Sequence, residues 1–187
     1  MRRIVLYLGM SLDGFAADRA GGVDWMEGQD PSDRREGSYD QFIQTVDTVW
    51  MGRTTYDQVT QQLSPGVWPY EGLETYVFTH RPAPGVGVPA GGRFTDAPLD
   101  RLARELRTRP GRDIWLCGGA DLARQALALD LVDQLRLTIL PILLGGGVPL
   151  FGPLDAPKKL TLEQIEEQNG MVECVYRRRE EWARRDL

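Results

Sequence analysis

The segment Ile4–Met10 (IVLYLGM) carries no charged residue on either of the two faces that a strand would present. A strand with one solvent-exposed face alternates apolar and polar residues, so a continuous apolar run predicts a central strand covered on both faces. Further strands are expected at Asp47–Gly52, Thr75–Thr79, Asp113–Cys117 and Leu135–Leu140. The pattern therefore predicts a sheet that is packed between layers of helices.

Segments with apolar residues at helical spacing separate these runs. Helices are expected to begin near Ser38, whose side chain could cap its helix, and near Thr54, Pro98 and Gly119. Two late strands, Leu160–Glu167 and Val172–Arg178, follow one another without a helix between them. Loops are expected at Asp13–Asp33, Pro82–Gly92 and Pro141–Leu150. We therefore expect an α/β fold whose mostly parallel sheet ends in antiparallel strands.

The length of 187 residues suits one domain, and we expect residues 1–178 to form it, followed by a charged tail at 179–187. The net charge of −5 argues against nucleic acid as a partner. Cys117, Cys174 and His80 are the only cysteines and histidine, too few for a structural zinc site, and we expect no bound metal. We expect a cytoplasmic protein, because no apolar stretch is long enough to span a membrane.

Three strand ends carry groups suited to phosphate. Gly118-Gly119 follows a strand and opens a helix, so backbone N–H groups and the helix dipole can attract an anion. A tight strand-to-helix turn is an equal alternative for these glycines. The tract Gly52–Tyr56 adds Arg53, a fork of donors, and two threonines suited to capping a helix. Ordinary capping beside a surface arginine is the alternative there.

The third strand end, Thr79-His80-Arg81, places a hydroxyl beside two possible cations, although a polar loop is the commoner meaning of such a triplet. All three tracts lie at the carboxyl ends of predicted strands, the edge where open α/β sheets bind ligands. Together they would suit a pyrophosphate and one further phosphate. This combination favours NADPH over NADH as the cofactor.

Several motifs occur in the order seen in a known family. Ser11–Ala16 (SLDGFA), Val49–Tyr56 (VWMGRTTY) and Trp115–Ala120 (WLCGGA) resemble the dihydrofolate reductases. Leu131–Leu137 and Leu140–Gly147 are more similar to the reductase domain of the bifunctional deaminase-reductase of bacterial riboflavin synthesis. The chain thus resembles a dihydrofolate reductase family protein of the RibD C-terminal type from Arg3 to about Arg178.

This resemblance implies a dihydrofolate-reductase-like three-layer fold, with a mixed central sheet of about eight strands flanked by helices. It also implies that NADPH lies across the strand ends and that the protein is a homodimer. The residues expected to hold the cofactor are Leu8, Gly9, Ala16, Gly52, Arg53, Thr54, Thr55, Thr79, His80, Arg81, Gly118, Gly119, Ala120, Asp121 and Leu122.

The substrate side is less firmly marked in the sequence. Glu36 is the nearest match to the acidic residue that opens the first helix of dihydrofolate reductases, and Asp30, Asp33 and Asp40 are its rivals. Asp24, Trp25 and Phe42 are the expected substrate contacts, although Trp25 could equally anchor its loop to the core.

Other singled-out residues have structural interpretations. Asp13 is expected to be buried, where it would accept hydrogen bonds from its own turn. Trp50 and Trp115 are expected in the core, and Cys117 is expected to be a buried thiol rather than a nucleophile.

The functional hypothesis is hydride transfer from NADPH to a small flat heterocycle, similar to a pterin or pyrimidine, or to a carbonyl compound. This would make the chain an oxidoreductase related to 5-amino-6-(5-phosphoribosylamino)uracil reductase. The alternatives are a non-catalytic NADPH-binding sensor and a protein that sequesters a heterocycle.

Overall fold

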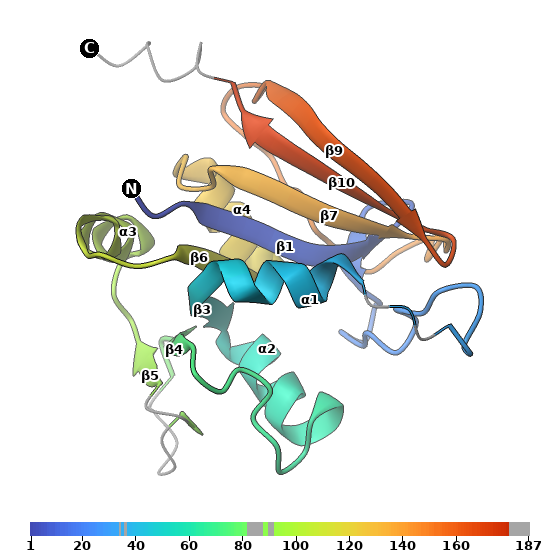
Figure 1. Ribbon diagram of the computed structural model, residues 1–187, viewed down its shortest axis with the longest axis horizontal. Helices are drawn as coiled ribbons and strands as arrows, with labels where there is room; N and C mark the ends of the chain where they lie inside the picture. The colour runs from blue at the N-terminus through green and yellow to red at the C-terminus, as the bar shows by residue number, and fades with distance from the viewer. Residues whose placement is uncertain (34, 36, 82–87, 90–91, 180–187) are drawn as a thin grey trace.

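The computed structural model describes residues 1–33, 35, 37–81, 88–89 and 92–179. Within this part of the chain, eight strands form one sheet in the order β5-β4-β3-β6-β1-β7-β10-β9 (Figure 1). The strands of this sheet are β1 (Ile4–Ser11), β3 (Val46–Gly52), β4 (Glu74–Phe78), β5 (Arg93–Thr95), β6 (Asp113–Gly118), β7 (Gln134–Leu140), β9 (Leu160–Gln168) and β10 (Met171–Arg178). The expected mixed sheet of about eight strands is confirmed.

Neighbouring strands run parallel from β5 through to β7, and β10 and β9 then pair antiparallel. Successive residues of β1 face opposite sides, so Ile4 and Leu6 enter one hydrophobic cluster while Val5 and Tyr7 enter another. The unbroken apolar run is therefore explained by a strand that lies between two cores.

Helices complete the two outer layers. The helices are α1 (Ser38–Phe42), α2 (Arg53–Gln58), α3 (Leu99–Thr108) and α4 (Ala120–Ala128), and a five-residue π-helical turn, Val59–Leu63, extends α2. Buried residues of α3 and α4 belong to the first cluster, and those of α1 and α2 belong to the second. The expected three-layer arrangement is thus confirmed, with α1 and α4 on opposite faces in Figure 1.

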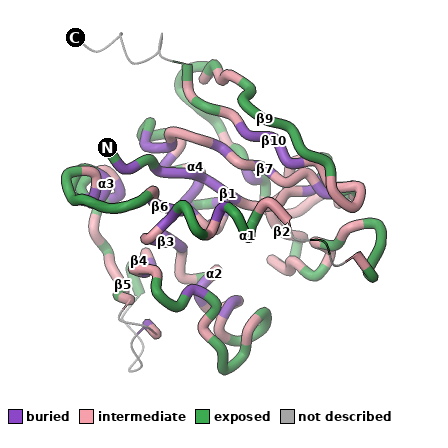
Figure 2. The backbone as a smooth tube through the Cα atoms, in the orientation of Figure 1, coloured by how far each residue is buried: buried purple, intermediate pink, exposed green. Residues whose placement is uncertain are grey.

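The β9–β10 hairpin extends the sheet past the helices. Strand β9 forms the edge and is largely exposed along its length, as Figure 2 shows. Its exposed side chains include Leu162 and Ile165. The antiparallel part of the sheet, formed by β9 and β10, is therefore less fully covered by helices than the parallel part.

Three short strands were not predicted. β5 lies at the other edge of the sheet, while β2 (Phe15–Ala17) and β8 (Val148–Pro149) pair with each other inside the two segments predicted as loops. Two or three residues carry too little periodicity to reveal a strand, and these strands exist because distant segments meet. Asp13, expected to be buried, is exposed and accepts N–H bonds from Leu144 and Gly145 of another loop.

Two expected helix caps are also wrong. Ser38 is the first residue of α1 and its side chain does not cap the helix, because its hydroxyl is bonded to Glu173. Helix α2 begins at Arg53 with Gly52 at its N-cap and without a side-chain cap bond from the described residues, so Thr54 and Thr55 do not cap it. Within the described residues, no helix is long and apolar enough to cross a membrane.

Candidate functional site

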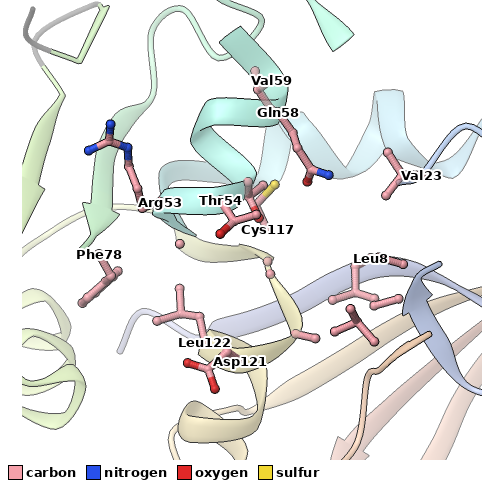
Figure 3. Close-up of a pocket in the computed structure, with 18 of the residues that line it drawn as sticks. Leu8, Val23, Arg53, Thr54, Gln58, Val59, Phe78, Cys117, Asp121 and Leu122 are labelled. Atoms are coloured by element: carbon pink, nitrogen blue, oxygen red, sulfur yellow. The ribbon is translucent and has the colours of Figure 1, made fainter. Parts of the chain in front are cut away.

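A cleft of about 1130 Å³ opens at the carboxyl ends of β1, β3, β4 and β6 (Figure 3). This volume lies above the roughly 300–1000 Å³ of an ordinary small-ligand site. Every residue predicted to hold the cofactor, apart from Arg81, lines this cleft. The structure therefore brings tracts from three separate strand ends to a single site, as the sequence predicted.

The β6–α4 junction forms one wall of the cleft. Gly118 has a φ of +137°, a conformation that side-chain-bearing residues rarely adopt. Gly119 is the N-cap of α4, and no side chain of the described residues bonds to the free N–H groups there. These groups are left to face the cleft, where the helix dipole favours an anion.

The β3–α2 junction packs directly against the first one. A Cβ atom added to Gly52 would lie 3.6 Å from the Gly119 nitrogen, and one added to Gly119 would lie 3.2 Å from Thr55 Oγ1. The two backbones approach this closely because glycine occupies both strand ends. Two of the three tracts predicted to bind phosphate thus meet at Gly52, Thr55 and Gly119.

Arg53 contributes a cation to this surface. Its Nε donates to Asp57 Oδ1 at 2.8 Å, and its guanidinium lies 5.4 Å from the centre of the Phe94 ring. Its Nη1 is buried without a hydrogen-bond partner among the described residues. A buried guanidinium nitrogen seeks an acceptor, so the residues present fit a phosphate of a dinucleotide at this wall.

The third predicted tract is only partly in the cleft. Thr79 and His80 line it, whereas Arg81 is exposed and lies outside the lining. The Thr79 hydroxyl oxygen accepts the Arg81 backbone N–H at 3.0 Å, which turns the chain away from the strand. The segment 82–87 that follows is outside the described residues.

The other half of the cleft is aromatic. Tyr7, Tyr39, Tyr70 and Trp115 line it, and their rings form a chain of edge and tilted contacts with centroids 5.3–6.3 Å apart. Such a wall can stack on a flat ring. Figure 3 shows the lining side chains of the cleft, with Arg53 and Asp121 on one side and Leu8 and Val23 on the other.

Cys117 lies between these halves and is a thiol. Burial raises its pKa to about 12, and its sulfur lies 3.7 Å from the Tyr70 hydroxyl. A thiol with this pKa is almost fully protonated at neutral pH and is a poor nucleophile. The buried core position predicted for Trp50 is confirmed, and Trp115 is also buried but contributes to the cleft wall.

The predicted substrate residues lie elsewhere. Phe42 is buried against the rings of Tyr7 and Trp115, behind the cleft wall. Trp25 donates its indole N–H to Gly22 and, like Asp24, is not among the lining residues. The aromatic contacts that the sequence assigned to Trp25 and Phe42 are available instead from Tyr7 and Trp115.

The predicted acid, Glu36, falls outside the described residues. Its rivals are engaged or distant from the cleft. Asp30 accepts from Ser32, Asp33 pairs with Arg35, and Asp40 is exposed on α1. These three rivals do not line the cleft, so the identity of a proton donor stays a prediction.

A buried polar cluster behind Tyr7 escaped the sequence analysis. The Tyr7 hydroxyl lies 2.9 Å from Ser38 Oγ, which donates to Glu173 Oε2 at 2.5 Å. Arg136 Nη2 donates to Glu173 Oε1 at 2.6 Å, and the side chains of this ion pair are largely buried. The sequence shows one charged residue inside each of two late strands, Arg136 and Glu173, and this could have indicated a buried ion pair. Whether the two side chains meet, however, depends on the order of the strands in the sheet.

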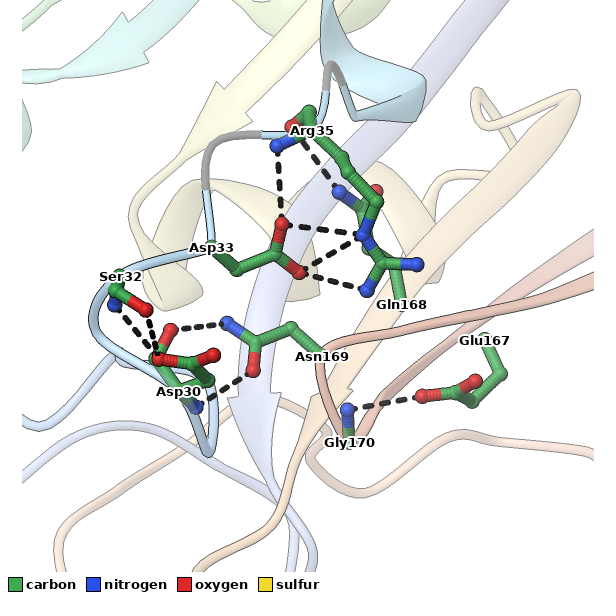
Figure 4. Close-up of polar contacts among 8 residues, drawn as sticks. All are labelled: Asp30, Ser32, Asp33, Arg35, Glu167, Gln168, Asn169 and Gly170. Atoms are coloured by element: carbon green, nitrogen blue, oxygen red, sulfur yellow. Dashed lines mark hydrogen bonds and ion pairs between the residues drawn. The ribbon is translucent and has the colours of Figure 1, made fainter.

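The loop between β2 and α1, called the substrate-side loop below, is held by hydrogen bonds to the β9–β10 turn (Figure 4). Asn169 Oδ1 accepts the Asp30 N–H at 2.7 Å, and Asn169 Nδ2 donates to the Asp30 carbonyl at 2.9 Å. Gln168 Nε2 donates to the Arg35 carbonyl at 3.1 Å. The loop that carries Val23 and Met26 into the cleft is therefore fixed by residues about 140 positions later in the chain.

Comparisons with known proteins agree with this geometry. The family model described as the RibD C-terminal domain matches residues 2–172. The uncharacterized protein YwjB of Bacillus subtilis is 34% identical over 175 residues, which cover 94% of this chain and 97% of YwjB.

Two solved structures are also similar. One is a putative riboflavin biosynthesis protein from Shewanella sp. PV-4, with 28% identity and a TM-score of 0.81 over 95% of this chain and 99% of that one. The other is a pyrimidine reductase-like protein from Corynebacterium diphtheriae, with 20% identity and a TM-score of 0.67 over 95% and 92% of the two chains. From the family match, the relative and the cleft together, the chain belongs to the RibD C-terminal domain family.

Proposed function

We propose that this protein is an NADPH-dependent reductase that transfers a hydride to a small flat heterocycle of the pyrimidine or pterin kind. One observation carries the proposal: a single cleft joins a glycine-rich, cationic half at the strand ends to an aromatic half. A dinucleotide would be bound by the cationic half, and a flat hydride acceptor would be bound by the aromatic half. One similar structure is named a pyrimidine reductase-like protein, which supports the same activity.

The chain's own residues would bind and orient the two ligands. Arg53 and the N-terminal N–H groups of α4 would hold phosphate groups, and Gly118 and Gly119 would let the backbone approach them. Leu8, Gly9 and Ala16 would border the nicotinamide between the two halves. NADPH, when bound, supplies the hydride. The protein supplies orientation and excludes water.

The distinguishing experiment is a calorimetric titration with NADPH and NADH. We expect NADPH to bind at least about tenfold more tightly, which corresponds to ~1.4 kcal/mol. Arg53→Ala should weaken NADPH binding by about tenfold or more, because it removes the buried donor. Arg104→Ala is the matched control, since Arg104 also pairs with an acidic residue one helical turn away but lies outside the cleft lining.

Arg81→Ala tests the remaining sequence-based assignment. A loss confined to NADPH would place Arg81 at the 2′-phosphate, and an unchanged affinity would leave that phosphate to the residues that line the cleft. If wild type bound neither nucleotide, the proposal would be wrong.

The non-catalytic alternative is favoured by one observation. Among the described lining residues, the aromatic half of the cleft contains no carboxylate that could deliver a proton. A sensor or a sequestering protein would bind the ligand without turnover. Spectrophotometric assay of NADPH oxidation with a panel of pterins, pyrimidines and quinones decides between the two: oxidation with any of them supports the reductase, and binding without oxidation supports the alternative.

A homodimer is the assembly that we propose. The exposed edge strand β9, with Leu162 and Ile165 on its surface, offers an apolar face for a second copy. Analytical ultracentrifugation of wild type and of an Ile165→Lys variant tests it, because a lysine on this face should shift the protein toward monomer.

A further inference from the structure

The Arg53 guanidinium is held on two sides by other residues of the protein. Its Nε donates to Asp57 Oδ1 at 2.8 Å, and its central carbon lies 5.4 Å from the centre of the Phe94 ring. Arg53 begins α2 directly after β3, whereas Phe94 belongs to β5, two strands away in the sheet. A long side chain that would otherwise sample many rotamers is therefore fixed in one extended arrangement.

Asp57 takes part in this arrangement without lining the cleft. Arg53 and Gln58, which lie on either side of it in α2, are both lining residues, and Asp57 is not (Figure 3). The side chains of Arg53 and Asp57 are only 20% and 26% exposed. Asp57 can therefore influence a ligand in two ways, through the position of Arg53 and through its own negative charge.

These two influences have opposite signs for an anionic ligand. As a hydrogen-bond acceptor, Asp57 fixes the guanidinium in advance, so less side-chain entropy is lost when a ligand binds. As a carboxylate, it cancels the formal charge of Arg53, so an approaching phosphate meets a neutral pair instead of a full cation. The first effect needs only a lone pair and the second needs the charge, which makes them separable.

An ion pair at this spacing can also serve only to stabilise its helix. Two observations distinguish this pair. Arg53 Nη1 is buried without a hydrogen-bond partner among the described residues, which is unusual for a guanidinium whose task is complete. The Arg104–Asp100 pair has the same spacing in α3, but its side chains are 76% and 46% exposed and lie outside the cleft lining.

We propose that Asp57 is a positioning residue that holds Arg53 in place to bind a phosphate of the cofactor, while its charge limits the affinity. The inference rests on the proposed function for the presence of a phosphate-bearing cofactor in the cationic half. A cofactor that is consumed in each turnover must also be released, so an affinity below the maximum is compatible with rapid turnover.

The experiment compares Asp57→Asn with Asp57→Ala by calorimetric titration with NADPH. Both variants lose the same charge, but only asparagine keeps an oxygen that can accept the Arg53 Nε–H. We expect Asp57→Asn to bind NADPH at least about fivefold more tightly than Asp57→Ala, the value of about one hydrogen bond. We also expect it to bind at least as tightly as wild type, because the charge that opposes the phosphate is gone.

Repeating the comparison in an Arg53→Ala background tests whether Asp57 acts through the arginine. Without Arg53 there is no guanidinium to position, so the Asn and Ala variants should bind NADPH alike. A contribution of Asp57 to the stability of the helix alone would persist in this background. Alanine is a good helix former, so Asp57→Ala should fold, and thermal unfolding checks this.

Salt dependence gives a second measurement. In Asp57→Asn the cation is no longer compensated, so NADPH affinity should fall more steeply with rising salt than in wild type. Asp100→Asn and Asp100→Ala are the matched controls, because they change the exposed pair of α3, and both should bind NADPH as wild type does.

Equal NADPH binding by Asp57→Asn and Asp57→Ala would overturn the positioning role. So would a difference between them that is equally large without Arg53. Weaker binding by Asp57→Asn than by wild type would overturn the limiting role of the charge. In each of these cases wild type still binds NADPH and the proposed function stands, whereas a wild type that does not bind NADPH would reject the proposed function itself.

Discussion

The two halves of the cleft are built in different ways. In the cationic half, each tract is a few consecutive residues at a strand end, as in Gly52–Thr55 and Gly118–Leu122. The aromatic half is backed by the buried polar cluster, whose groups come from β1, α1, β7 and β10 and meet only in the folded protein. The residues of the cationic half can be recognised in short stretches of sequence. The residues of the aromatic half and of the cluster behind it come together only through the order of the strands in the sheet.

Because the two halves are built differently, a substitution is expected to impair them in different ways. In the cationic half, function depends on backbone conformation and on Arg53, whose buried Nη1 has no hydrogen-bond partner among the described residues. In the aromatic half, it depends on whether buried polar groups remain paired. Substitutions in the two halves, and a change of pH, should therefore have separable effects on stability and on binding.

Arg136→Met should cost about 3 kcal/mol of unfolding free energy, because it leaves the carboxylate of Glu173 buried without its cation. Arg177→Met, on the neighbouring strand, removes the partner of Glu163 from a more exposed pair and should cost less than about 1 kcal/mol. Urea unfolding of both variants gives the comparison. Equal losses would show that the buried cluster has no special role in stability.

Gly118→Ala should lower stability by about 1–2 kcal/mol, because alanine is strained at a φ of +137°. It should also weaken NADPH binding, since the strand end can no longer hold its conformation. Gly72→Ala is the control: it has a φ of +84° in open surroundings, so it shares the backbone strain but lies outside the cleft lining. Thermal unfolding and NADPH titration together separate strain from binding, and parallel loss of affinity in both variants would contradict the assignment.

Asn169→Gly should cost about 1 kcal/mol, because it deletes both side-chain hydrogen bonds to Asp30 while glycine tolerates the φ of 55° at this turn. We expect weaker binding of flat heterocycles, since the substrate-side loop loses its attachment, and unchanged binding of NADPH. A variant of an exposed β9 residue, Gln164→Ala, should change neither affinity. Loss of NADPH binding in Asn169→Gly would mean that the two halves are not separable.

The smallest effect is a pH dependence. The folded-state pKa of Glu173 lies below its ordinary value of 4.5, so the unfolded chain binds a proton first as the pH falls. The stability that this carboxylate contributes is therefore fully present above about pH 4.5 and is lost as the pH falls through the folded-state pKa. Unfolding free energies measured from pH 6 to pH 3 should fall more steeply for wild type than for Glu173→Gln, and identical slopes would contradict this account.

How much could be predicted from the sequence also differs between the cationic and the aromatic half of the cleft. Strands β1, β3, β4 and β6 were predicted because each contains an apolar run that is covered on both faces, and the glycine tracts were predicted because they adjoin those runs. Ser38 was misassigned as a cap because the sequence does not show that Glu173 competes for its hydroxyl.

Tyr7 was missed for a related reason. It belongs to an apolar run, and nothing beside it in the chain indicates that its hydroxyl has a buried partner. Phe42, by contrast, was predicted to contact substrate but lies one layer too deep. The sequence thus indicated that the site needs aromatic residues, but the layer in which each ring lies is a property of the tertiary packing.

The parallel direction of β1, β3, β4 and β6 has a practical consequence for handling this protein. Because these strands end at the cleft, the turns that precede them lie at the opposite edge of the sheet. The exposed turn Arg109–Gly111, just before β6, is such a place. A fluorophore or affinity tag inserted at Pro110 would be separated from the cleft by the length of strand β6, which makes it a suitable attachment point for surface immobilisation in binding assays.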